Sequence, residues 1–272
     1  QALALLPPES RPIVLHQSGM RQLDELRANY ARAGVTAELT HVWGAHQLKL
    51  GLWYERAEHR QTGPMVAVDA AGNPTDQWLR DGQILRPDGK PFQSRDWLTV
   101  SPAYQAYAAD TFSFDGDKGV LTVGLRTPHI TRKFTNTSSE AGGTSLSSYT
   151  FEKAYSTLLP QLGLRYNFGK EHQVFANIGK NFRAPPNFAF APTNGNITVT
   201  GGVPSLTTPI EAETAIATDL GYRFQGKAFS ASATVFNVDF KNRQSNAFDP
   251  NTLRSVYTNA GKSTKRGLEV EA

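Results

Sequence analysis

The sequence predicts an all-β fold: a transmembrane antiparallel β-barrel whose strands run up and down in chain order. Three observations lead to this prediction. Apolar and polar side chains alternate along segments of about ten residues, short and long connections alternate between these segments, and the polar positions carry charges. Barrels that span a membrane combine these features, because their turns and loops gather at opposite ends around a polar lumen.

The composition sets the broad class of the protein. The chain has 272 residues, of which 39% are hydrophobic and 19% charged, so it can form one large β domain or two smaller ones. No stretch approaches the roughly 18 consecutive apolar residues that a spanning helix needs. The apolar residues near the start stop at Pro7 and Pro8 and follow no charged leader, so we expect no signal peptide there.

The first four strands are expected at residues 34–43, 46–55, 104–114 and 119–126. In the second of these, Leu48, Leu50 and Leu52 alternate with polar residues, and in the fourth Leu121, Val123 and Leu125 do the same. The phase of 104–114 is blurred, although its composition is that of a strand. Alternation with a period of two residues indicates a strand with one apolar face.

A hairpin is expected at residues 163–182. Leu164 and Tyr166 share one parity, Arg165 and Asn167 share the other, and the apolar phase resumes after a polar turn. We expect Leu164 and Tyr166 to face lipid and the two polar residues to face a hydrated or plugged lumen. A closed barrel is the one kind of sheet that satisfies its backbone hydrogen bonds in lipid.

The last strands are expected at residues 214–224, 228–240 and 266–272. In 228–240 the apolar residues change parity between Val235 and Phe236, which predicts a β-bulge near Val235. In 214–224, Ile216, Leu220, Tyr222 and Phe224 share one parity, and Asp219, Gly221 and Arg223 share the other. The last one alternates up to the final residues of the sequence.

The connections support an up-and-down sheet. Short turns are expected at Gly44-Ala45, 115–119, 169–172 and 225–227, and long loops at about 56–97, 134–156 and 184–213. Residues 1–33 are expected to form a lead-in of strand or loop, and residues 34–272 a partial barrel. A soluble β-sandwich binding module also alternates, but its strands average nearer five or six residues.

Several kinds of chemistry have no support in the sequence. The chain has no cysteine, and its six histidines lack the spacing of a metal site. No nucleotide-binding loop or nucleophile motif is present, so we expect neither catalytic residues nor an enzyme. The net charge of +4 is spread along the chain, so nucleic acid is not an expected partner.

Several phrases resemble a known family, in the order in which that family carries them. These are HQLKLGLWYE, YQAYAADTFSF, LTVGLR, LPQLGLRYNF, HQVFANIGKNFRAP, EAETAIATDLGYRF and YTNAGKSTKRGLEVEA. The series is similar to TonB-dependent outer-membrane receptors. The resemblance implies a fragment of a 22-stranded barrel in the bacterial outer membrane, with the plug domain of the family absent from this chain.

The resemblance also implies a function. Receptors of this family import scarce nutrients actively, most often a ferric siderophore or another iron chelate. The energy would come from the TonB-ExbB-ExbD complex through a segment outside this chain, and the barrel would contact outer-membrane lipid. Cobalamin, haem, copper and oligosaccharide are alternative cargoes, and a passive porin-type barrel is an alternative mode of transport.

Phe182, Arg183, Ala184 and Pro185 resemble a motif that follows a barrel strand in many of these receptors. In the haem-uptake branch a loop with a ligand histidine comes next. The loop that follows here has no histidine, which disfavours haem. The motif can also mark a plain strand exit, because proline ends the ladder of hydrogen bonds.

A ligand site is expected on the lumen at the loop side of the barrel. An anionic ferric chelate would bind to cationic side chains and stack on aromatic rings. No protein-bound cofactor is expected. Such cations can instead bind a plug or remain solvated. The candidates at the loop-proximal strand ends are Trp53, Arg126, Arg132, Lys133, Arg183 and Phe188.

Overall fold

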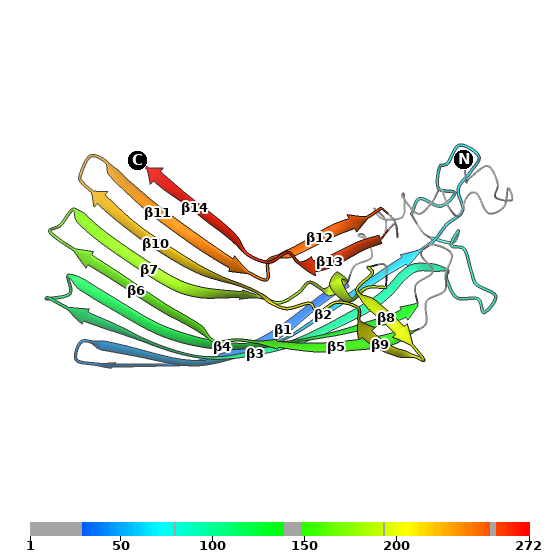
Figure 1. The fold of residues 1–272 in the computed structure, drawn as a ribbon, viewed down its shortest axis with the longest axis horizontal. Helices are drawn as coiled ribbons and strands as arrows, with labels where there is room; N and C mark the ends of the chain where they lie inside the picture. Colours follow the sequence, from blue (N-terminus) through cyan, green and yellow to red (C-terminus); the bar gives the residue numbers. More distant parts are fainter. Residues whose placement is uncertain (1–28, 79, 139–147, 193, 251–253) are drawn as a thin grey trace.

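The computed structural model describes residues 29–78, 80–138, 148–192, 194–250 and 254–272. A ten-stranded antiparallel sheet dominates this part of the chain, with the strand order β1-β2-β3-β4-β6-β7-β10-β11-β14 and with β5 also paired to β4 (Figure 1). The two other hairpins, β8-β9 and β12-β13, lie outside this sheet. The strands are β1 (Asn29–Trp43), β2 (His46–Pro64), β3 (Gln93–Phe114), β4 (Gly119–Ser138), β5 (Tyr149–Ser156), β6 (Leu159–Asn167), β7 (His172–Arg183), β8 (Ile197–Thr200), β9 (Val203–Leu206), β10 (Glu213–Gln225), β11 (Ser230–Lys241), β12 (Gln244–Asp249), β13 (Arg254–Asn259) and β14 (Ser263–Glu271).

The short turns lie together at one end of the sheet and the long connections at the other (Figure 1), as the sequence predicts. Gly44 and Gly169 have positive φ, and so do Asp115 and Asp117 in the turn between β3 and β4. Aspartate and glycine adopt this left-handed region more readily than other residues, so these turns are encoded locally.

The strands continue further toward the loop end than the sequence indicated. β2 ends at Pro64 and β3 begins at Gln93, so the connection expected at 56–97 is reduced to residues 65–92. β4 continues to Ser138, and β5 occupies part of the expected loop 134–156. The hairpin β12-β13, between β11 and β14, was not expected. Most of the expected lead-in, residues 1–28, lies outside the described residues.

One face of the sheet is apolar across all the long strands. Leu39 is opposite Leu50, which is opposite Ala108, and that residue is opposite Leu125. On the other half of the sheet, a second such row consists of Leu164, Ala176, Leu220, Val235 and Leu268. These rows form the predicted lipid face. Leu220 is 58% exposed in the isolated chain, as expected for a side chain that contacts lipid rather than protein.

The predicted bulge in β11 is wrong. The register of β11 with β10 and with β14 runs without a shift through Val235. Phe236 therefore lies on the polar face, opposite Asp219 and Gly267, and its ring covers Gly267. The change of apolar parity comes from three apolar side chains on the lumen face, those of Phe236, Val238 and Phe240, and not from an extra residue.

Aromatic rings form a belt on the outer face at the turn end. Trp43 and His46 stack with centroids 5.2 Å apart, and His46 contacts Phe112 at 4.8 Å. Further along the belt, His172 is 5.6 Å from Phe168. Belts of this kind mark the membrane interface of transmembrane barrels, so the turn end lies at one membrane surface.

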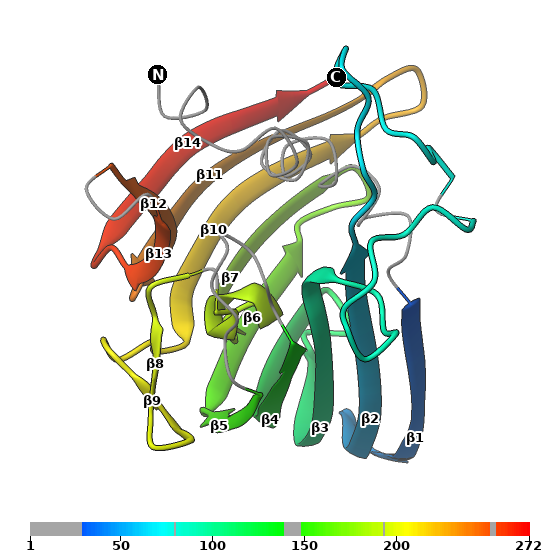
Figure 2. The same cartoon turned by 90° about the vertical axis from the view of Figure 1, so that its right-hand side faces the viewer.

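The ten strands curve but do not close into a barrel in the described residues (Figure 2). β1 and β14 form the two edges, and each is hydrogen-bonded to a neighbour on one side. Among the described residues, no helix has the length and apolar character needed to cross a membrane.

Candidate functional site on the lumen face

The polar face of the sheet, called the lumen face below, carries a hollow of about 710 Å³. Polar side chains from β6, β7 and β10 line it, among them Gln161, Arg165, Asn177, Asp219 and Arg223. Arg223 donates a hydrogen bond of 3.3 Å to the side-chain oxygen of Gln173. The hollow therefore presents both charges and amides to whatever fills the lumen.

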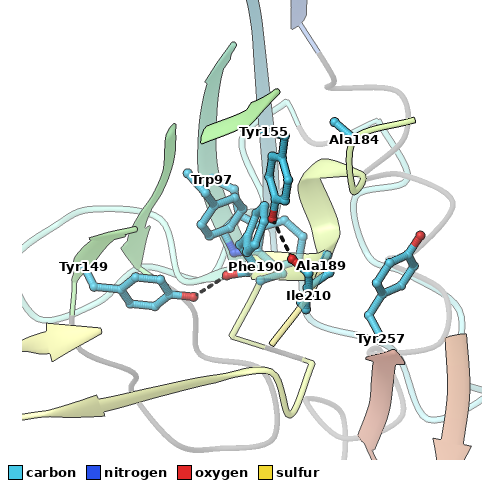
Figure 3. Close-up of a cluster of buried hydrophobic side chains, with 10 residues drawn as sticks. Trp97, Tyr149, Tyr155, Ala184, Ala189, Phe190, Ile210 and Tyr257 are labelled. Carbon is cyan, nitrogen blue, oxygen red and sulfur yellow. Dashed lines mark hydrogen bonds between the residues drawn. The ribbon is translucent and has the colours of Figure 1, made fainter. Parts of the chain in front are cut away.

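A buried aromatic cluster lies further toward the loop end of the lumen face (Figure 3). Trp97, Phe134, Tyr149 and Tyr155 come from β3, β4 and β5, and their parity is that of the lumen face. Against them pack Ala189, Phe190, Ala191 and Ile210 from the connection between β7 and β10. This connection therefore folds inward over the lumen instead of extending away from the barrel.

Three side chains of β5 fix the connection by its backbone. The Tyr149 hydroxyl donates to the carbonyl of Phe190 at 2.8 Å, and the Tyr155 hydroxyl donates to the carbonyl of Ile210 at 3.2 Å (Figure 3). Lys153 Nζ donates to the same Ile210 carbonyl at 2.9 Å. Burial raises the pKa of both tyrosine hydroxyls, so they remain protonated donors at neutral pH.

The β12-β13 hairpin holds the same connection from another side. Asn196 accepts the backbone N–H of Tyr257 at 2.8 Å and donates to its carbonyl at 2.5 Å. Asn259 donates to the carbonyl of Glu211 at 3.0 Å. Because Asn196 and Tyr257 are buried, these bonds replace contacts with water that burial removes.

Arg132 joins β4 to this connection. Its Nε donates to the carbonyl of Pro185 at 3.2 Å, and its Nη1 donates to Ser101 Oγ at 2.7 Å. Burial lowers the pKa of the guanidinium, although an arginine remains charged at any physiological pH. Within the described residues no carboxylate forms an ion pair with Arg132. It is thus a half-buried cation on the lumen face that lacks an anionic partner there.

Two of the expected site residues lie deeper in the lumen than predicted. Trp53 and Arg126 were expected at loop-proximal strand ends, but β2 and β4 continue well beyond both. Both face the lumen: Trp53 opposite Gln105, and Arg126 opposite Tyr107. The Nε of Arg126 is buried and has no hydrogen-bond partner among the described residues.

The placement of Lys133 on the lumen is wrong. Lys133 lies opposite Val100 and Glu152, on the outer face of the sheet. Successive residues of a strand point to opposite faces, so Arg132 and Lys133 cannot both face the lumen.

The Phe182–Pro185 motif ends a strand and enters the inward connection. Arg183 is exposed and is the last residue of β7, whereas Ala184 and Pro185 are buried. Phe188 lies in the short 3₁₀ helix η3 (Asn187–Phe190), with its ring 5.5 Å from that of Tyr257. The structure therefore brings Arg132 into contact with the motif through Pro185, and it places Arg183 and Phe188 near Tyr257.

Sequence reasoning missed the residues that hold the inward connection, namely Trp97, Tyr149, Lys153, Tyr155 and Phe190. A partial signal for β5 was present, because Tyr149, Phe151 and Tyr155 share one parity while Thr150, Glu152 and Ser156 share the other. The sequence predicts a loop here because residues 134–156 are rich in Gly, Ser and Thr, which favour connections over strands.

The acidic loop between β2 and β3 is built from side-chain caps. Asp76 accepts the backbone N–H groups of Gly82 at 2.9 Å and of Trp78 at 3.2 Å. Asp69 caps the backbone N–H groups of Ala71 and Asn73 in the same way. These bonds hold the pKa of both carboxyls below the ordinary value, so the carboxylates stabilise the turns of this loop.

Comparisons with known proteins agree on one family. Residues 8–272 match the family model described as TonB dependent receptor-like, beta-barrel. Among solved structures, the copper transporter OprC aligns with a TM-score of 0.66 at 18% identity, covering 89% of this chain and 35% of that one. The unliganded ferric citrate transporter FecA aligns at 0.59 with 20% identity, over 89% and 32% of the two chains. The ferric yersiniabactin uptake receptor FyuA from Yersinia pestis aligns at 0.59 with 16% identity, over 90% and 32%.

A separate similarity covers a short stretch only. The UDP-N-acetylglucosamine–N-acetylmuramyl-(pentapeptide) pyrophosphoryl-undecaprenol N-acetylglucosamine transferase of Albidiferax ferrireducens is 78% identical over 40 residues, which are 15% of this chain and 10% of that enzyme. Its counterpart in a Polaromonas species is 75% identical over 40 residues, with the same coverage. The chain thus spans about a tenth of these curated relatives and about a third of the receptors.

Proposed function

Because the chain belongs to the family of TonB-dependent receptor β-barrels, which are bacterial outer-membrane proteins, we propose that it is part of an active importer of a ferric siderophore or another iron chelate. The family consists of receptors and transporters and not of enzymes. The proposed energy source is the TonB-ExbB-ExbD complex, which would act through a segment outside this chain.

Arg132 carries the proposal for an anionic cargo. Ferric chelates with carboxylate or phenolate groups are commonly anionic, and a guanidinium binds such oxygens through paired hydrogen bonds. Arg132 uses Nε and Nη1 within the described structure, and its Nη2 has no bond there. A half-buried guanidinium without an acidic partner gains more from an anion than a solvated one does.

The neighbouring structures include transporters of copper and of iron, and iron is the metal of this proposal. Two of them are named as transporters of ferric citrate and of ferric yersiniabactin. We propose that the cargo meets the loop-side lumen first, where Arg132, Arg183 and Phe188 lie, and then the deeper lumen with Trp53 and Arg126. The polar hollow would follow along the same face.

The test uses the full-length receptor in detergent, with ferric citrate and ferric catecholate and hydroxamate chelates as probes. We expect at least one chelate to bind with micromolar or tighter affinity. Replacing Arg132 by Gln should weaken that binding about 10- to 100-fold, because a hydrogen bond to a charged group is worth ~1.5–3 kcal/mol. Binding is read out by isothermal calorimetry.

Lys133→Gln is the matched control, because it removes the same charge from the neighbouring residue on the opposite face. Its affinity should stay within about twofold of the wild type. The heat-induced mobility shift on gels shows whether each variant folds into a barrel. Arg132→Lys keeps the positive charge and is measured beside Arg132→Gln, so that a loss of folding can be distinguished from a loss of binding. Binding of only cobalamin, copper, haem or a sugar would reject iron as the cargo. Equal affinities of the two glutamine variants would reject Arg132 as the residue that binds the chelate.

A further inference from the structure

A recess of about 420 Å³ opens in the structure where β7, β10, β11 and β14 approach the loop end. Lys180, Lys241, Lys262 and Thr264 line it together with Asp239. Lys180 of β7 is opposite Ile216 of β10, and Ile216 is opposite Asp239 of β11. Asp239 is in turn opposite Thr264 of β14. Ile216 has the parity of Leu220, so this row belongs to the outer, lipid-facing side of the sheet.

The recess lies one membrane thickness away from the turn end. Lys180 is eight residues after His172, the first residue of β7, and Asp239 is nine residues after Ser230, the first residue of β11. A tilted strand crosses the hydrocarbon core in about 9–11 residues. Since the aromatic belt marks one membrane surface at the turn end, the recess is at the headgroup level of the opposite leaflet.

The lining of the recess has an excess of positive charge. Lys180 Nζ donates to Thr157 Oγ1 at 2.9 Å, whereas Lys241 and Lys262 are exposed and form no ion pair with another described residue. The only carboxylate of the lining, Asp239, already accepts hydrogen bonds from Thr264 at 2.7 Å and from Asn237 at 2.8 Å. The lining therefore has three lysines and one carboxylate, and that carboxylate is already hydrogen-bonded to Thr264 and Asn237.

Ile216 lines the recess itself, and Ile178 is exposed on the outer face one row nearer the turn end. That row also contains the polar residues Thr218, Asn237 and Arg266, and the exposed apolar row of Leu220, Val235 and Leu268 follows it. A ligand with a charged head and apolar chains would place both parts on matching surfaces. A free anion in solution would use the lysines alone.

We propose that this recess binds a phosphate-bearing lipid headgroup of the leaflet on the long-loop side, with the acyl chains along the apolar rows below. Lysine ammonium groups bind phosphate oxygens as compact point charges, and each basic residue near a membrane surface strengthens the attraction to anionic lipid. The site is on the outside of the barrel and is separate from the cargo site on the lumen face.

The experiment uses the full-length receptor in detergent and native mass spectrometry with dioctanoyl phosphatidic acid as the probe. The triple variant Lys180→Gln, Lys241→Gln, Lys262→Gln should bind the probe about a hundredfold more weakly than the wild type, since each lysine near a headgroup contributes roughly a factor of five. Dioctanoylglycerol, which lacks the phosphate, should bind both proteins equally weakly.

The control variant Lys90→Gln, Lys133→Gln, Lys265→Gln removes the same charge at positions that do not line the recess. It should retain the affinity of the wild type within about twofold. If inorganic phosphate at millimolar concentration displaced the probe completely, the site would be a general phosphate site and the lipid proposal would be overturned. Equal losses in the two triple variants would overturn it as well, because only net charge would then matter.

Discussion

At the scale of single residues, the neighbours Arg132 and Lys133 show how the alternation of side chains along a strand places adjacent cations on opposite faces of the sheet. Both were candidates for the same ligand site. Arg132 contacts Pro185 and Ser101 on the lumen face, and Lys133 lies on the outer face between Val100 and Glu152. Residue type alone makes both cations candidates for binding an anionic ligand. The position of each residue along the strand decides whether its side chain is on the lumen face, where it could contact that ligand.

The caps made by Asp76 predict the acid response of the loop between β2 and β3. The folded pKa of this carboxyl is below its ordinary value of 3.8 because backbone N–H groups donate to it. Its stabilising contribution is therefore complete above about pH 4 and is lost as the pH falls through the lower, folded pKa. Trp78 is two residues after Asp76 and donates its backbone N–H to that carboxylate. The fluorescence of Trp78, obtained by subtracting the Trp78→Phe variant, should stay constant from pH 8 to 5 and change below about 3.8.

Asp76→Asn provides the control for this titration. The variant keeps one acceptor oxygen but cannot titrate, so the acid transition of Trp78 fluorescence should disappear. A transition between pH 5 and 8 in the wild-type receptor would contradict this assignment, because no shift of the Asp76 pKa upward is compatible with the N–H donors around it.

At the scale of elements, the strand positions were predictable and their ends were not. Alternation and turn chemistry located the hairpins at Gly44, Gly169 and the turn of residues 115–118, because these signals are local. The loop-side extensions of β2, β3 and β4 were not predicted, because these stretches have the Gly-, Pro-, Ser-, Thr- and Asn-rich composition of connections. β5 packs through Tyr149 and Tyr155 against a segment more than thirty residues away, and a local pattern contains no sign of such a partner.

The glycines of the lumen face make a prediction about strand packing. A Cβ atom at Gly221 would lie 2.1 Å from the Phe175 ring, whereas at Gly179 the nearest atom would be 3.7 Å away. Gly221→Ala should displace Phe175, over which Arg223 lies at 5.6 Å, and should lower the free energy of unfolding by about 1–3 kcal/mol. Urea unfolding of the full-length receptor in micelles measures this difference. Gly179→Ala serves as the control, with an expected change below about 1 kcal/mol. Equal stability of both variants would show that the ring does not need this space.

At the scale of the whole molecule, two opposite faces define the protein as a section of a membrane barrel. The apolar rows on one side and the polar hollow on the other were both expected from period-two alternation. The inward fold of the connection between β7 and β10 was not expected, because it depends on contacts among three separate parts of the chain. Most of the fold and the position of Arg132 on the lumen face were thus predictable from the sequence, whereas the inward fold of the connection between β7 and β10 was not.

The two faces predict opposite responses to the same substitution. Leu220 is five residues before Gln225, the end of β10, which places it near the middle of the membrane on the outer face. Leu220→Arg should lower the free energy of unfolding from lipid vesicles by about 2–4 kcal/mol. Asn177→Arg, in the hollow and opposite Asp219, should change it by less than about 1 kcal/mol. Similar costs for the two variants would contradict the assignment of the faces.

The anchoring of the connection between β7 and β10 has an evolutionary consequence. Tyr149, Tyr155, Lys153 and Arg132 all donate to main-chain carbonyls, at Phe190, Ile210 and Pro185. Every amino acid provides such a carbonyl, so these fastenings do not require particular side chains in the segment they hold. Its exposed positions are free to diversify under selection while its path over the lumen face is preserved, so the surface presented there can change without changes in the strands that hold it.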